Sequence, residues 1–366
     1  MQRVLRILGI RGIPAQHGGF ETFAERLACH LLAAGWRVIV YCQDEGRGPV
    51  VEDMWEGVER IRFPISHAGP KGTMLFDLKA TLHAAKHDDL CLVLGYNTAV
   101  FTALLRCRGI PCLINMDGIE WARAKWGRAA KTWFWLNDWA GCWLGTHLIA
   151  DHPEIKNHLS TRVSPKKITM IPYGAELIET ANASLLQPIG LTAGSFFTLI
   201  ARAEPENSIL EVVRAFSCRP RGVSLAILGN YDESNAYHRA VRAAASDEVR
   251  FLGAIYDKAT LGSLRLHSIA YIHGHQVGGT NPSLVEALGA GNAIIAHDNR
   301  FNRWVAGPEA LYFSSEGQLS DMIDKLLTNA TLATTMRIAS RQRHADALTW
   351  KDVLQAYEQI LTRFQA

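Results

Sequence analysis

The sequence predicts an α/β protein made of two doubly wound parallel sheets. Three observations support this prediction. Short apolar runs alternate with helical stretches along the whole chain, and two glycine-rich turns stand directly before helices. A chain of 366 residues is also long enough for about two domains. Apolar residues make up 48% of the chain, which is normal for a soluble protein of this class.

The first half begins with an apolar run at residues 4–8, which predicts a buried parallel strand. A glycine-containing turn follows, and then a helix over residues 19–34 that Gly35 terminates. The other strands expected in this half are 37–41, 58–62, 90–94, 112–114, 147–150 and 168–172, with further helices at 75–86 and 98–106. Repeated strand–helix alternation indicates one parallel sheet.

The second half predicts another sheet of the same kind. Residues 175–193 have little pattern, and we interpret them as a linker. Strands are expected at 196–200, 224–228, 249–252, 269–272 and 293–296, and helices at 208–215 and 281–290. Residues 349–366 form a helical pattern whose apolar stripe needs a partner surface, which we expect on the first domain. The predicted domains are 1–178, 179–348 and the C-terminal helix 349–366.

Bulk properties restrict the environment of the protein. The net charge of +3 gives no reason to expect a nucleic-acid partner. The seven cysteines form no CxxC and no Cys/His pair at zinc spacing, which predicts free thiols in a reducing compartment. Met1 leads directly into the first strand, and no apolar run reaches about 18 residues. We therefore expect a cytoplasmic protein without a membrane-spanning helix.

The strongest local signal is the glycine-rich loop before the helix at 281–290. Its residues are Gly278, Gly279, Thr280, Asn281, Pro282 and Ser283. Free backbone N–H groups and the positive end of a helix dipole favour phosphate at such a position. Glu286 follows in the first turns of the helix, where a carboxylate suits hydroxyl groups such as those of a ribose. Phosphate together with a diol indicates a nucleotide.

A second glycine loop follows the first strand. It contains Arg11, Gly18 and Gly19, but its spacing matches neither the GxGxxG nor the P-loop pattern. Arg11 lies between a strand end and a glycine turn, so it is a candidate phosphate ligand; the alternative is an ion pair with a nearby acid. Two Rossmann-like sheets in tandem place ligands outside the carboxyl ends of their strands.

Three further side chains follow strand ends. Asp117 comes just after the strand near residue 114 and can orient or deprotonate an acceptor hydroxyl, or simply cap a turn. His273 and His275 precede the second glycine loop, where they contact the donor or shape the loop. We expect no metal site, because no third ligand at suitable spacing and no Asp-x-Asp motif occur.

On these residues the chain resembles the GT-B glycosyltransferases, specifically glycosyltransferase family 4. Within it, the chain is similar to bacterial rhamnosyltransferases that extend polyprenyl-diphosphate-linked sugars in polysaccharide biosynthesis. The matching segments are 7–28, 115–126, 150–159, 171–176, 201–208 and 271–296. The resemblance implies two Rossmann-like domains that face a cleft, with the C-terminal helix crossing back to the first domain.

The resemblance also implies roles for individual residues. Gly18 and Gly19 would lie against the donor diphosphate, which Arg202 contacts from the second domain. Glu286 would take the ribose hydroxyls, and the backbone around Ile255 would read the base. The loop over the phosphates and sugar would consist of Gly279, Thr280, Asn281, Pro282 and Ser283. The family transfers its sugar with retention and needs no metal or other cofactor.

Two departures from the family pattern concern charge. Many members carry lysine where this chain has Asn207, and glutamate where it has Gly278. Fewer positive charges therefore lie at the phosphates. We expect Asn207 still to border the donor, and Arg11, His273 or His275 to supply the missing charge.

The expected function is retaining transfer of L-rhamnose from dTDP-rhamnose to a lipid-diphosphate-linked saccharide. One alternative is a transferase of the same fold that uses a UDP-hexose or a UDP-N-acetylhexosamine. A sugar-nucleotide 2-epimerase and a non-catalytic nucleotide-binding scaffold are further alternatives. The two departures are the reason to keep the scaffold as an alternative.

A tryptophan-rich segment bears on the acceptor. Six of the chain's ten tryptophans lie within residues 121–143, and basic residues are interleaved with them. Aromatic and basic side chains together suit a membrane interface, although aromatics are also common in a packed core. We interpret the segment as part core and part membrane-facing surface. We therefore expect peripheral association with the inner face of the cytoplasmic membrane.

Overall fold

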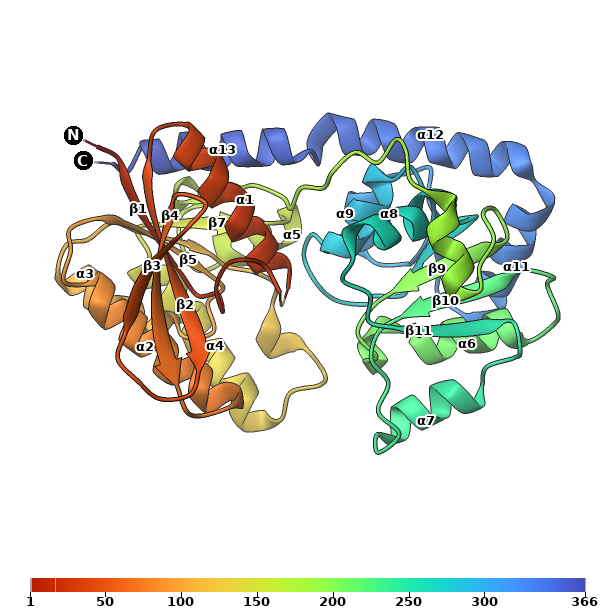
Figure 1. Cartoon of the computed structure of the whole chain (residues 1–366), viewed down its shortest axis with the longest axis horizontal. Coiled ribbons are helices and arrows are strands. Elements are labelled where there is room, and N and C mark those ends of the chain that lie inside the picture. Colours follow the sequence, from red (N-terminus) through yellow and green to blue (C-terminus); the bar gives the residue numbers. More distant parts are fainter. Residues whose placement is uncertain (1, 17, 366) are drawn as a thin grey trace. The chain divides into compact units, whose positions relative to one another are not determined.

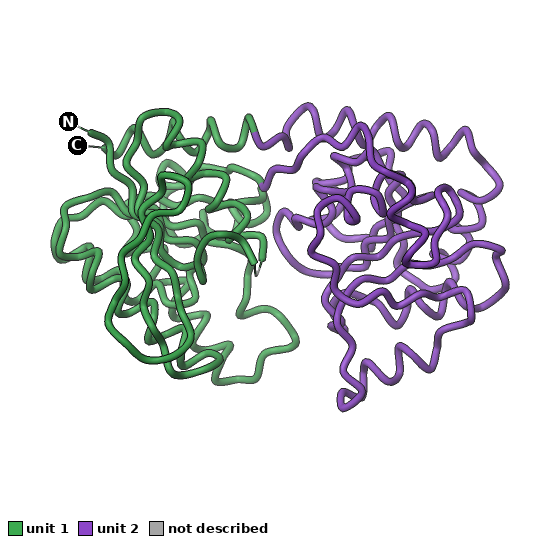
Figure 2. Tube along the Cα trace, in the orientation of Figure 1, with its two compact units in different colours: residues 1–172, 351–366 green, residues 173–350 purple. Residues whose placement is uncertain are grey.

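The computed structural model describes residues 2–16 and 18–365. Its chain divides into two compact units (Figure 2). Unit 1 runs up to Pro172 and includes the segment from Lys351 onward, and unit 2 is Tyr173–Trp350. The first unit is therefore interrupted in sequence by the whole of the second.

Unit 1 contains a mixed sheet with the strand order β3-β4-β2-β1-β5-β6-β7-β8 among the described residues. Its strands are β1 Val4–Leu8, β2 Arg37–Glu45, β3 Val51–Trp55, β4 Val58–Ile65, β5 Leu90–Leu94, β6 Cys112–Asn115, β7 His147–Ala150 and β8 Ile168–Met170. Neighbouring strands are parallel except for β3, which pairs antiparallel with β4 across a tight turn. In this turn Glu56 and Gly57 both have positive φ, as hairpins of this length require.

Helices cover unit 1, and one of them comes from the end of the chain (Figure 1). They are α1 Gly19–Ala33, α2 Gly69–Ala84, α3 Ala103–Cys107, α4 Arg128–Leu144, α5 Pro153–Ser160 and α13 Trp350–Thr362, with short 3-10 turns η1 Ala99–Thr102, η2 Glu120–Ala122 and η3 Pro165–Lys167. Helix α13 lies beside α1: His30 and Glu358 are 2.8 Å apart, and the rings of Phe23 and Tyr357 are 4.5 Å apart. Leu361 of α13 is fully buried, so the last helix completes the core of unit 1.

Unit 2 contains a parallel sheet with the strand order β11-β10-β9-β12-β13-β14. Its strands are β9 Phe196–Ile200, β10 Ser224–Leu228, β11 Val249–Gly253, β12 Ala270–His273, β13 Ala293–His297 and β14 Leu311–Phe313. Its helices are α6 Ile209–Ser217, α7 Ala236–Ala243, α8 Lys258–His267, α9 Pro282–Gly289, α10 Arg300–Ala306, α11 Glu316–Thr328 and α12 Ala330–Ala347, with the 3-10 turns η4 Ala183–Ile189 and η5 Pro205–Asn207.

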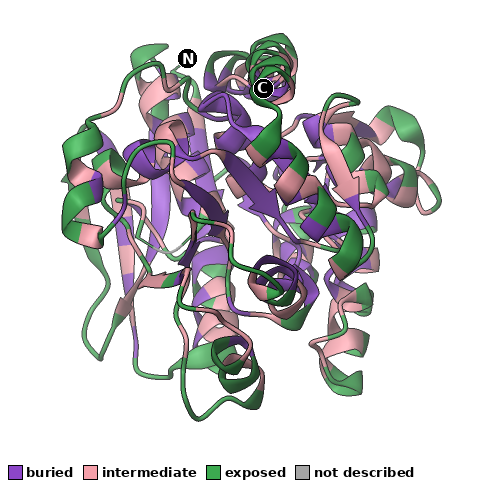
Figure 3. Ribbon diagram, turned by 90° about the vertical axis from the view of Figure 1, so that its right-hand side faces the viewer, coloured by how far each residue is buried: buried purple, intermediate pink, exposed green. Residues whose placement is uncertain are grey.

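The central strands carry the cores of both units. Strand β5 of unit 1 and strand β12 of unit 2 are buried along their whole length. Figure 3 shows buried residues on central strands and exposed residues on outer helices. Strands that are buried on both faces appear in the sequence as continuous apolar runs, and these runs predicted where the strands lie. The predicted α/β class with two Rossmann-like parallel-sheet units is confirmed.

Strand order defines where each sheet can bind a ligand. In unit 1 the chain reverses direction across the sheet between β1 and β5, and in unit 2 between β9 and β12. At such a reversal, the loops that follow the two strands diverge and leave a crevice outside their carboxyl ends. The residues after these four strands are therefore the first place to look for a site.

Candidate functional site

Helix α9 of unit 2 begins at the reversal between β9 and β12. The Ser283 hydroxyl donates to the carbonyl of Ile200, the last residue of β9, at 3.1 Å. The Tyr271 hydroxyl of β12 donates to the same carbonyl at 3.2 Å and lies 2.6 Å from the Ser283 hydroxyl. These bonds fix the first turn of α9 against the end of β9.

The start of α9 has the features of an anion site. Asn281 caps the helix by accepting the Ser283 N–H at 3.0 Å, and Pro282 occupies the first turn. Thr280 is buried before it, and Gly278 has a φ of 144°, a conformation that only glycine adopts readily. The positive end of the α9 dipole therefore lies at the carboxyl edge of the sheet.

A loop after β9 meets the loop after β12. Arg202 is exposed at the start of the first loop, and its carbonyl accepts the Asn207 side-chain amide at 2.8 Å. Gln276 donates its backbone N–H to the Glu206 carbonyl at 2.9 Å. A Cβ at Gly274 would lie 2.2 Å from the Asn207 carbonyl, so only glycine fits there. The site loops of unit 2 are thus held together at residues 202–208 and 274–283.

His273 and His275 stack at the end of β12. Their ring centroids are 4.3 Å apart and the ring planes differ by 9°. His273 is 1% exposed, and burial lowers its pKa well below the ordinary value, with His275 and His297 adding to the effect. His273 is therefore neutral near pH 7. Of the three residues predicted to supply positive charge at the phosphates, His273 is the one whose ring is buried, and burial disfavours its charged form.

Asn207 does not replace the charge of a lysine either. Its side chain is buried, and its amide braces the Arg202 loop from within. The amide oxygen has no hydrogen-bond partner among the described residues. Arg202 is consequently the exposed cation that begins this loop.

Glu286 and Ile255 lie away from the first turn of α9. The Glu286 carboxylate forms an ion pair with Arg265 of α8, and its side chain is one-third exposed. Ile255 follows β11 and packs its side chain against the apolar cluster that contains Leu228 and Leu264. The pairing of Glu286 with Arg265 has no signal in the sequence, because the partners lie on different helices.

In unit 1 the loop after β1 passes close to the end of β5. A Cβ at Gly9 would lie 2.4 Å from the Leu94 carbonyl, and Gly9 has a φ of 84°. The Arg11 backbone N–H donates to the Glu21 carboxylate of α1 at 3.1 Å, which folds the loop back on its helix. The Arg11 residue itself is exposed. Glu21 is a loop-shaping residue whose partner the sequence did not identify.

Gly18 and Gly19 form the start of α1. Gly18 precedes the helix without a side-chain cap, and its carbonyl accepts the Thr22 N–H at 3.2 Å. Gly19 is the first helical residue. Both glycines lie in the loop that begins at the carboxyl end of β1, as Arg11 does.

Asp117 follows β6, two strands away from β1. Its φ of 51° is unusual for a residue with a side chain. The conformation is held by the Asn115 side chain, whose oxygen accepts the Asp117 N–H at 2.9 Å. The same side chain donates to the Tyr357 hydroxyl of α13 at 2.7 Å. Helix α13 therefore helps to position Asp117.

The structure thus groups the predicted residues within each unit. Unit 2 brings together Arg202, Asn207, His273, His275, Gly279, Thr280, Asn281, Pro282 and Ser283 at the ends of β9 and β12. Sequence reasoning missed Tyr271 and Gly274. A glycine between two histidines directly after a strand was the available signal for the second of these.

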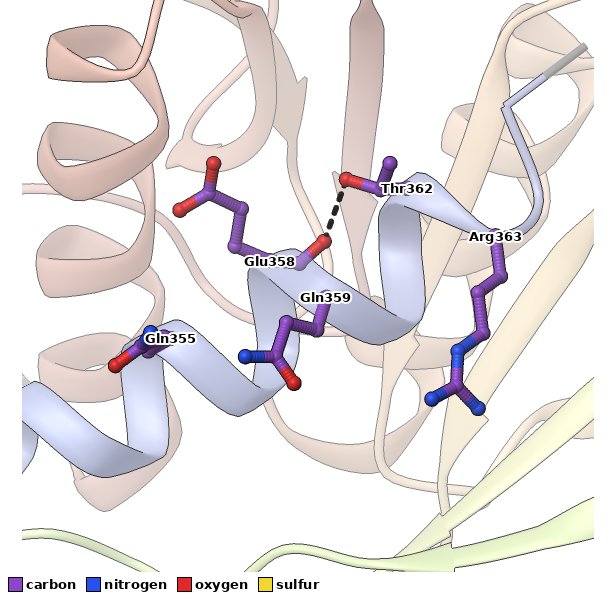
Figure 4. A pocket seen from close by; sticks show the side chains of 5 residues that line it. All are labelled: Gln355, Glu358, Gln359, Thr362 and Arg363. Carbon is purple, nitrogen blue, oxygen red and sulfur yellow. Dashed lines mark hydrogen bonds between the residues drawn. The ribbon is translucent and has the colours of Figure 1, made fainter.

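Among the described residues no group of three or more histidine, cysteine, aspartate or glutamate side chains is arranged to hold a metal ion. A hollow on α13 is lined by the polar side chains Gln355, Glu358, Gln359, Thr362 and Arg363 (Figure 4). Its lining comes from a single helix and includes none of the predicted site residues.

Comparison with known proteins identifies the fold. A family model described as a domain of unknown function, DUF1972, matches residues 1–176. No curated protein matches the chain. Among solved structures, sucrose-phosphate synthase from Thermosynechococcus elongatus is 19% identical, with 99% of each chain covered and a TM-score of 0.84.

Two further structures agree. Anabaena HepE in complex with UDP and glucose is 13% identical, with 99% of this chain and 100% of that chain covered and a TM-score of 0.79. The UDP-forming α,α-trehalose-phosphate synthase from Burkholderia xenovorans, in complex with glucose-6-phosphate, is 10% identical, with 98% and 100% covered and a TM-score of 0.74. The chain has the GT-B fold.

Proposed function

We propose that this protein is a retaining glycosyltransferase that takes its sugar from a nucleotide diphosphate. The observation that carries the proposal is the start of α9, pinned by Ser283 to the end of β9 beside the Arg202 loop. It stands at the strand reversal of unit 2 in a chain with the GT-B fold. A helix N-terminus and an exposed arginine together suit a diphosphate.

In the proposed reaction, charge stabilisation of the leaving diphosphate is the main contribution of the protein. The acceptor oxygen bonds to the anomeric carbon while the bond from that carbon to the diphosphate breaks. Arg202 and the positive end of the α9 dipole stabilise the charge that develops on the diphosphate. Attack on the same face retains the configuration, and the leaving phosphate takes the acceptor proton. Neither a metal ion nor another cofactor enters the scheme.

The remaining residues have proposed positions in the same scheme. Gly18 and Gly19 lie against the donor, and Arg11 provides a further cation. Asp117, whose conformation Asn115 fixes, orients the acceptor hydroxyl. Glu286 is shared between Arg265 and the ribose hydroxyls, and the backbone at Ile255 lies against the base.

For the donor we propose dTDP-L-rhamnose, and for the acceptor a polyprenyl-diphosphate-linked saccharide at the inner face of the cytoplasmic membrane. This choice rests on the resemblance to rhamnosyltransferases that we infer from six segments in order along the chain, including residues 271–296. A second candidate is a UDP-hexose or UDP-N-acetylhexosamine transferase. It is favoured by the structural similarity to HepE, which was solved with UDP and glucose.

Thermal unfolding with a panel of nucleotides separates the two candidates. The panel is dTDP, UDP, GDP and ADP, each also as its nucleotide sugars. A ligand at 100 times its dissociation constant adds about 2.7 kcal/mol to the free energy of unfolding. Stabilisation by dTDP and dTDP-rhamnose alone supports the first candidate, and stabilisation by UDP and its sugars alone supports the second. Absence of any shift refutes both, whereas binding without turnover indicates a nucleotide-binding scaffold.

A further inference from the structure

One face of α4 in unit 1 exposes large apolar side chains in a row. Trp135, Leu136 and Trp143 are 44%, 52% and 62% exposed. Trp139 lies between the two exposed tryptophans, with ring centroids 6.2 Å from Trp135 and 5.1 Å from Trp143. The tryptophans recur every four residues, so they form one stripe along the helix. We refer to Trp135, Leu136, Trp139 and Trp143 as the tryptophan stripe.

The opposite side of α4 is fixed to the body of unit 1. Asp138 is 2% exposed; its carboxylate accepts the Trp121 indole N–H at 2.7 Å and forms an ion pair with Arg162 at 2.8 Å. His158 of α5 lies 3.0 Å from the same oxygen. The Arg162 guanidinium also lies over the Trp139 ring, 4.6 Å from its centroid. A helix held this firmly cannot rotate to bury its stripe.

The element packed against the other side of α4 is η1. The Val100 backbone N–H donates to the buried Asn137 side chain of α4 at 2.9 Å. The stripe itself remains uncovered by it. An exposed apolar surface of this kind on a fixed helix marks an interaction site.

The exposed charges of α4 are basic. Asp138, which is buried, is the single acidic residue between residues 121 and 147. Arg128 is exposed in the first turn of α4, and Lys131 precedes Trp135 by one turn on the same face. The N-terminal end of α4 is therefore basic.

The C-terminal end of α4 is basic as well. The Lys167 ammonium donates to the Cys142 carbonyl at 2.8 Å. Burial lowers the pKa of Lys167, and the nearby Arg106 lowers it further. Lys166 is exposed beside it. Cations thus flank the apolar stripe at both ends.

We propose that the tryptophan stripe docks on a membrane surface that contains anionic lipid, with α4 lying in the plane of the interface. The proposal deepens the proposed function, because a lipid-linked acceptor would be presented at that surface. Tryptophan and leucine enter the boundary between headgroups and acyl chains, while flanking lysines and arginines are attracted to anionic headgroups. Among residues 2–16 and 18–365, no helix has both the length and the apolarity to cross a bilayer.

Charge complementarity favours the membrane over a second copy of this chain. A self-complementary contact between two α4 faces would bring the cations at the helix ends near those of the other copy, with no exposed carboxylate on α4 to pair with them. A surface of anionic lipid neutralises these cations and accepts the indoles at the same time.

The test is flotation of the full chain with vesicles. One set contains phosphatidylcholine alone, and the other also contains phosphatidylglycerol. The variant Trp135→Ser/Leu136→Ser/Trp143→Ser removes the exposed part of the stripe. Its matched control is Met54→Ser/Ile338→Ser, which removes two side chains that are 61% and 65% exposed elsewhere. We expect the wild type and the control to float with the phosphatidylglycerol vesicles, and the stripe variant to bind at least about ten-fold more weakly.

Specific outcomes overturn the proposal. It fails if the wild type does not float with anionic vesicles, or if the stripe variant floats as well as the control. A dimer that dissociates in the stripe variant, without vesicle binding by the wild type, would show that the face binds a second copy. If the stripe variant unfolds, Lys131→Glu/Lys166→Glu replaces it, and unchanged flotation of this variant equally refutes the proposal.

Nucleotide binding separates this proposal from the proposed function. Thermal shifts with dTDP and UDP are measured on the same preparations without vesicles. Flotation without any nucleotide shift leaves the docking surface standing and removes the transferase. A thermal shift with nucleotide but no flotation supports the transferase and refutes the docking surface.

Discussion

Each of the two glycine-rich loops follows the carboxyl end of a strand and leads into a helix, but the two loops are built differently. The loop after β1 enters α1 through Gly18, which provides no side-chain cap, and its Arg11 N–H is already taken by Glu21. The loop before α9 enters its helix through the Asn281 cap, and Ser283 ties that helix to the neighbouring strand. One loop is folded back on its own helix, and the other is braced by the sheet.

Under the proposed function, this difference favours the loop before α9 as the one that stabilises charge. A site that stabilises developing charge must hold its donors in place before the reaction, because reorganisation during the reaction weakens the effect. The bracing of α9 by Tyr271 and Ile200 provides such rigidity. The loop after β1, which ends in consecutive glycines, suits contact with the donor without providing the main stabilisation.

The largest expected effect tests the braced loop directly. Arg202→Ala should lower turnover by a factor of about 10²–10³, because it removes the exposed cation next to α9. The rate of sugar transfer from the nucleotide sugar identified by thermal shift provides the measurement.

Arg214→Ala is the matched control for Arg202→Ala. Arg214 lies on α6 with a half-exposed side chain and pairs with Glu316. Its loss should leave the rate unchanged. Equal rates for Arg202→Ala and Arg214→Ala would remove Arg202 from the mechanism.

A second prediction perturbs unit 1 alone. Asp77 of α2 accepts the Thr98 hydroxyl at 2.8 Å in the loop after β5, and burial raises its pKa from 3.8 to about 6. Between these values the folded protein keeps a proton that the unfolded chain has lost, so stability falls as pH rises through this window. Asp77→Asn removes the charge and should raise the free energy of unfolding at pH 8 by about 2 kcal/mol.

The pH dependence itself is the check on Asp77. Urea unfolding at pH 8 should show the gain, and unfolding below pH 3.8 should show little difference, because the carboxyl is then protonated in both states. Asp321→Asn, at an exposed side chain of unit 2, should change stability little at either pH. A gain that is independent of pH would contradict this explanation.

A third prediction compares one glycine from each loop. Gly278 has a φ of 144°, whereas Gly18 has an extended φ of 177° that any residue adopts. Gly278→Ala should therefore strain its loop and raise the KM for the donor about ten-fold. Gly18→Ala should raise it by less than about three-fold, because the nearby Glu21 carboxylate, 3.1 Å from the added Cβ, can shift. Equal effects on KM would mean that the two loops hold the donor in the same way.

The smallest expected effect concerns α13. Tyr357→Phe removes the hydroxyl that accepts the Asn115 amide, and Asn115 holds Asp117. We expect kcat to fall about three-fold to ten-fold while the donor KM is unchanged, because Asp117 is a residue for the acceptor in this scheme. Tyr312→Phe, which removes a hydroxyl bound to the Gly307 carbonyl in unit 2, is the control. A parallel change in KM would assign Tyr357 a purely structural role.

The sequence predicted what local patterns encode. Buried strands such as β5 and β12 are continuous apolar runs, and the start of α9 is marked by Asn281 and Pro282. Strand β3 was missed because it is an exposed edge strand, whose outward side chains include charged ones and therefore show no apolar run.

Contacts between distant segments could not be predicted. Asn115 and Tyr357 are 242 positions apart in the sequence, so no local pattern joins them. The neutral state of His273 depends on burial by its neighbours, which only the folded sheet determines. The ion pair of Arg265 with Glu286 likewise follows from how α8 lies against α9. Residue types at the strand ends therefore indicated the candidate site. The charge states of its residues and the hydrogen bonds and ion pairs that hold them could be determined only from the structure.

The return of α13 to unit 1 has a consequence for how the chain can be rearranged. The Gln365 side chain donates to the Val4 carbonyl at 2.7 Å, so the last helix and the first strand lie close together. A circular permutant that joins these ends and opens between Pro172 and Tyr173 would make each unit one continuous stretch of polypeptide. In the natural order, the ribosome must complete all of unit 2 before Tyr357 and Leu361 emerge to close the first core.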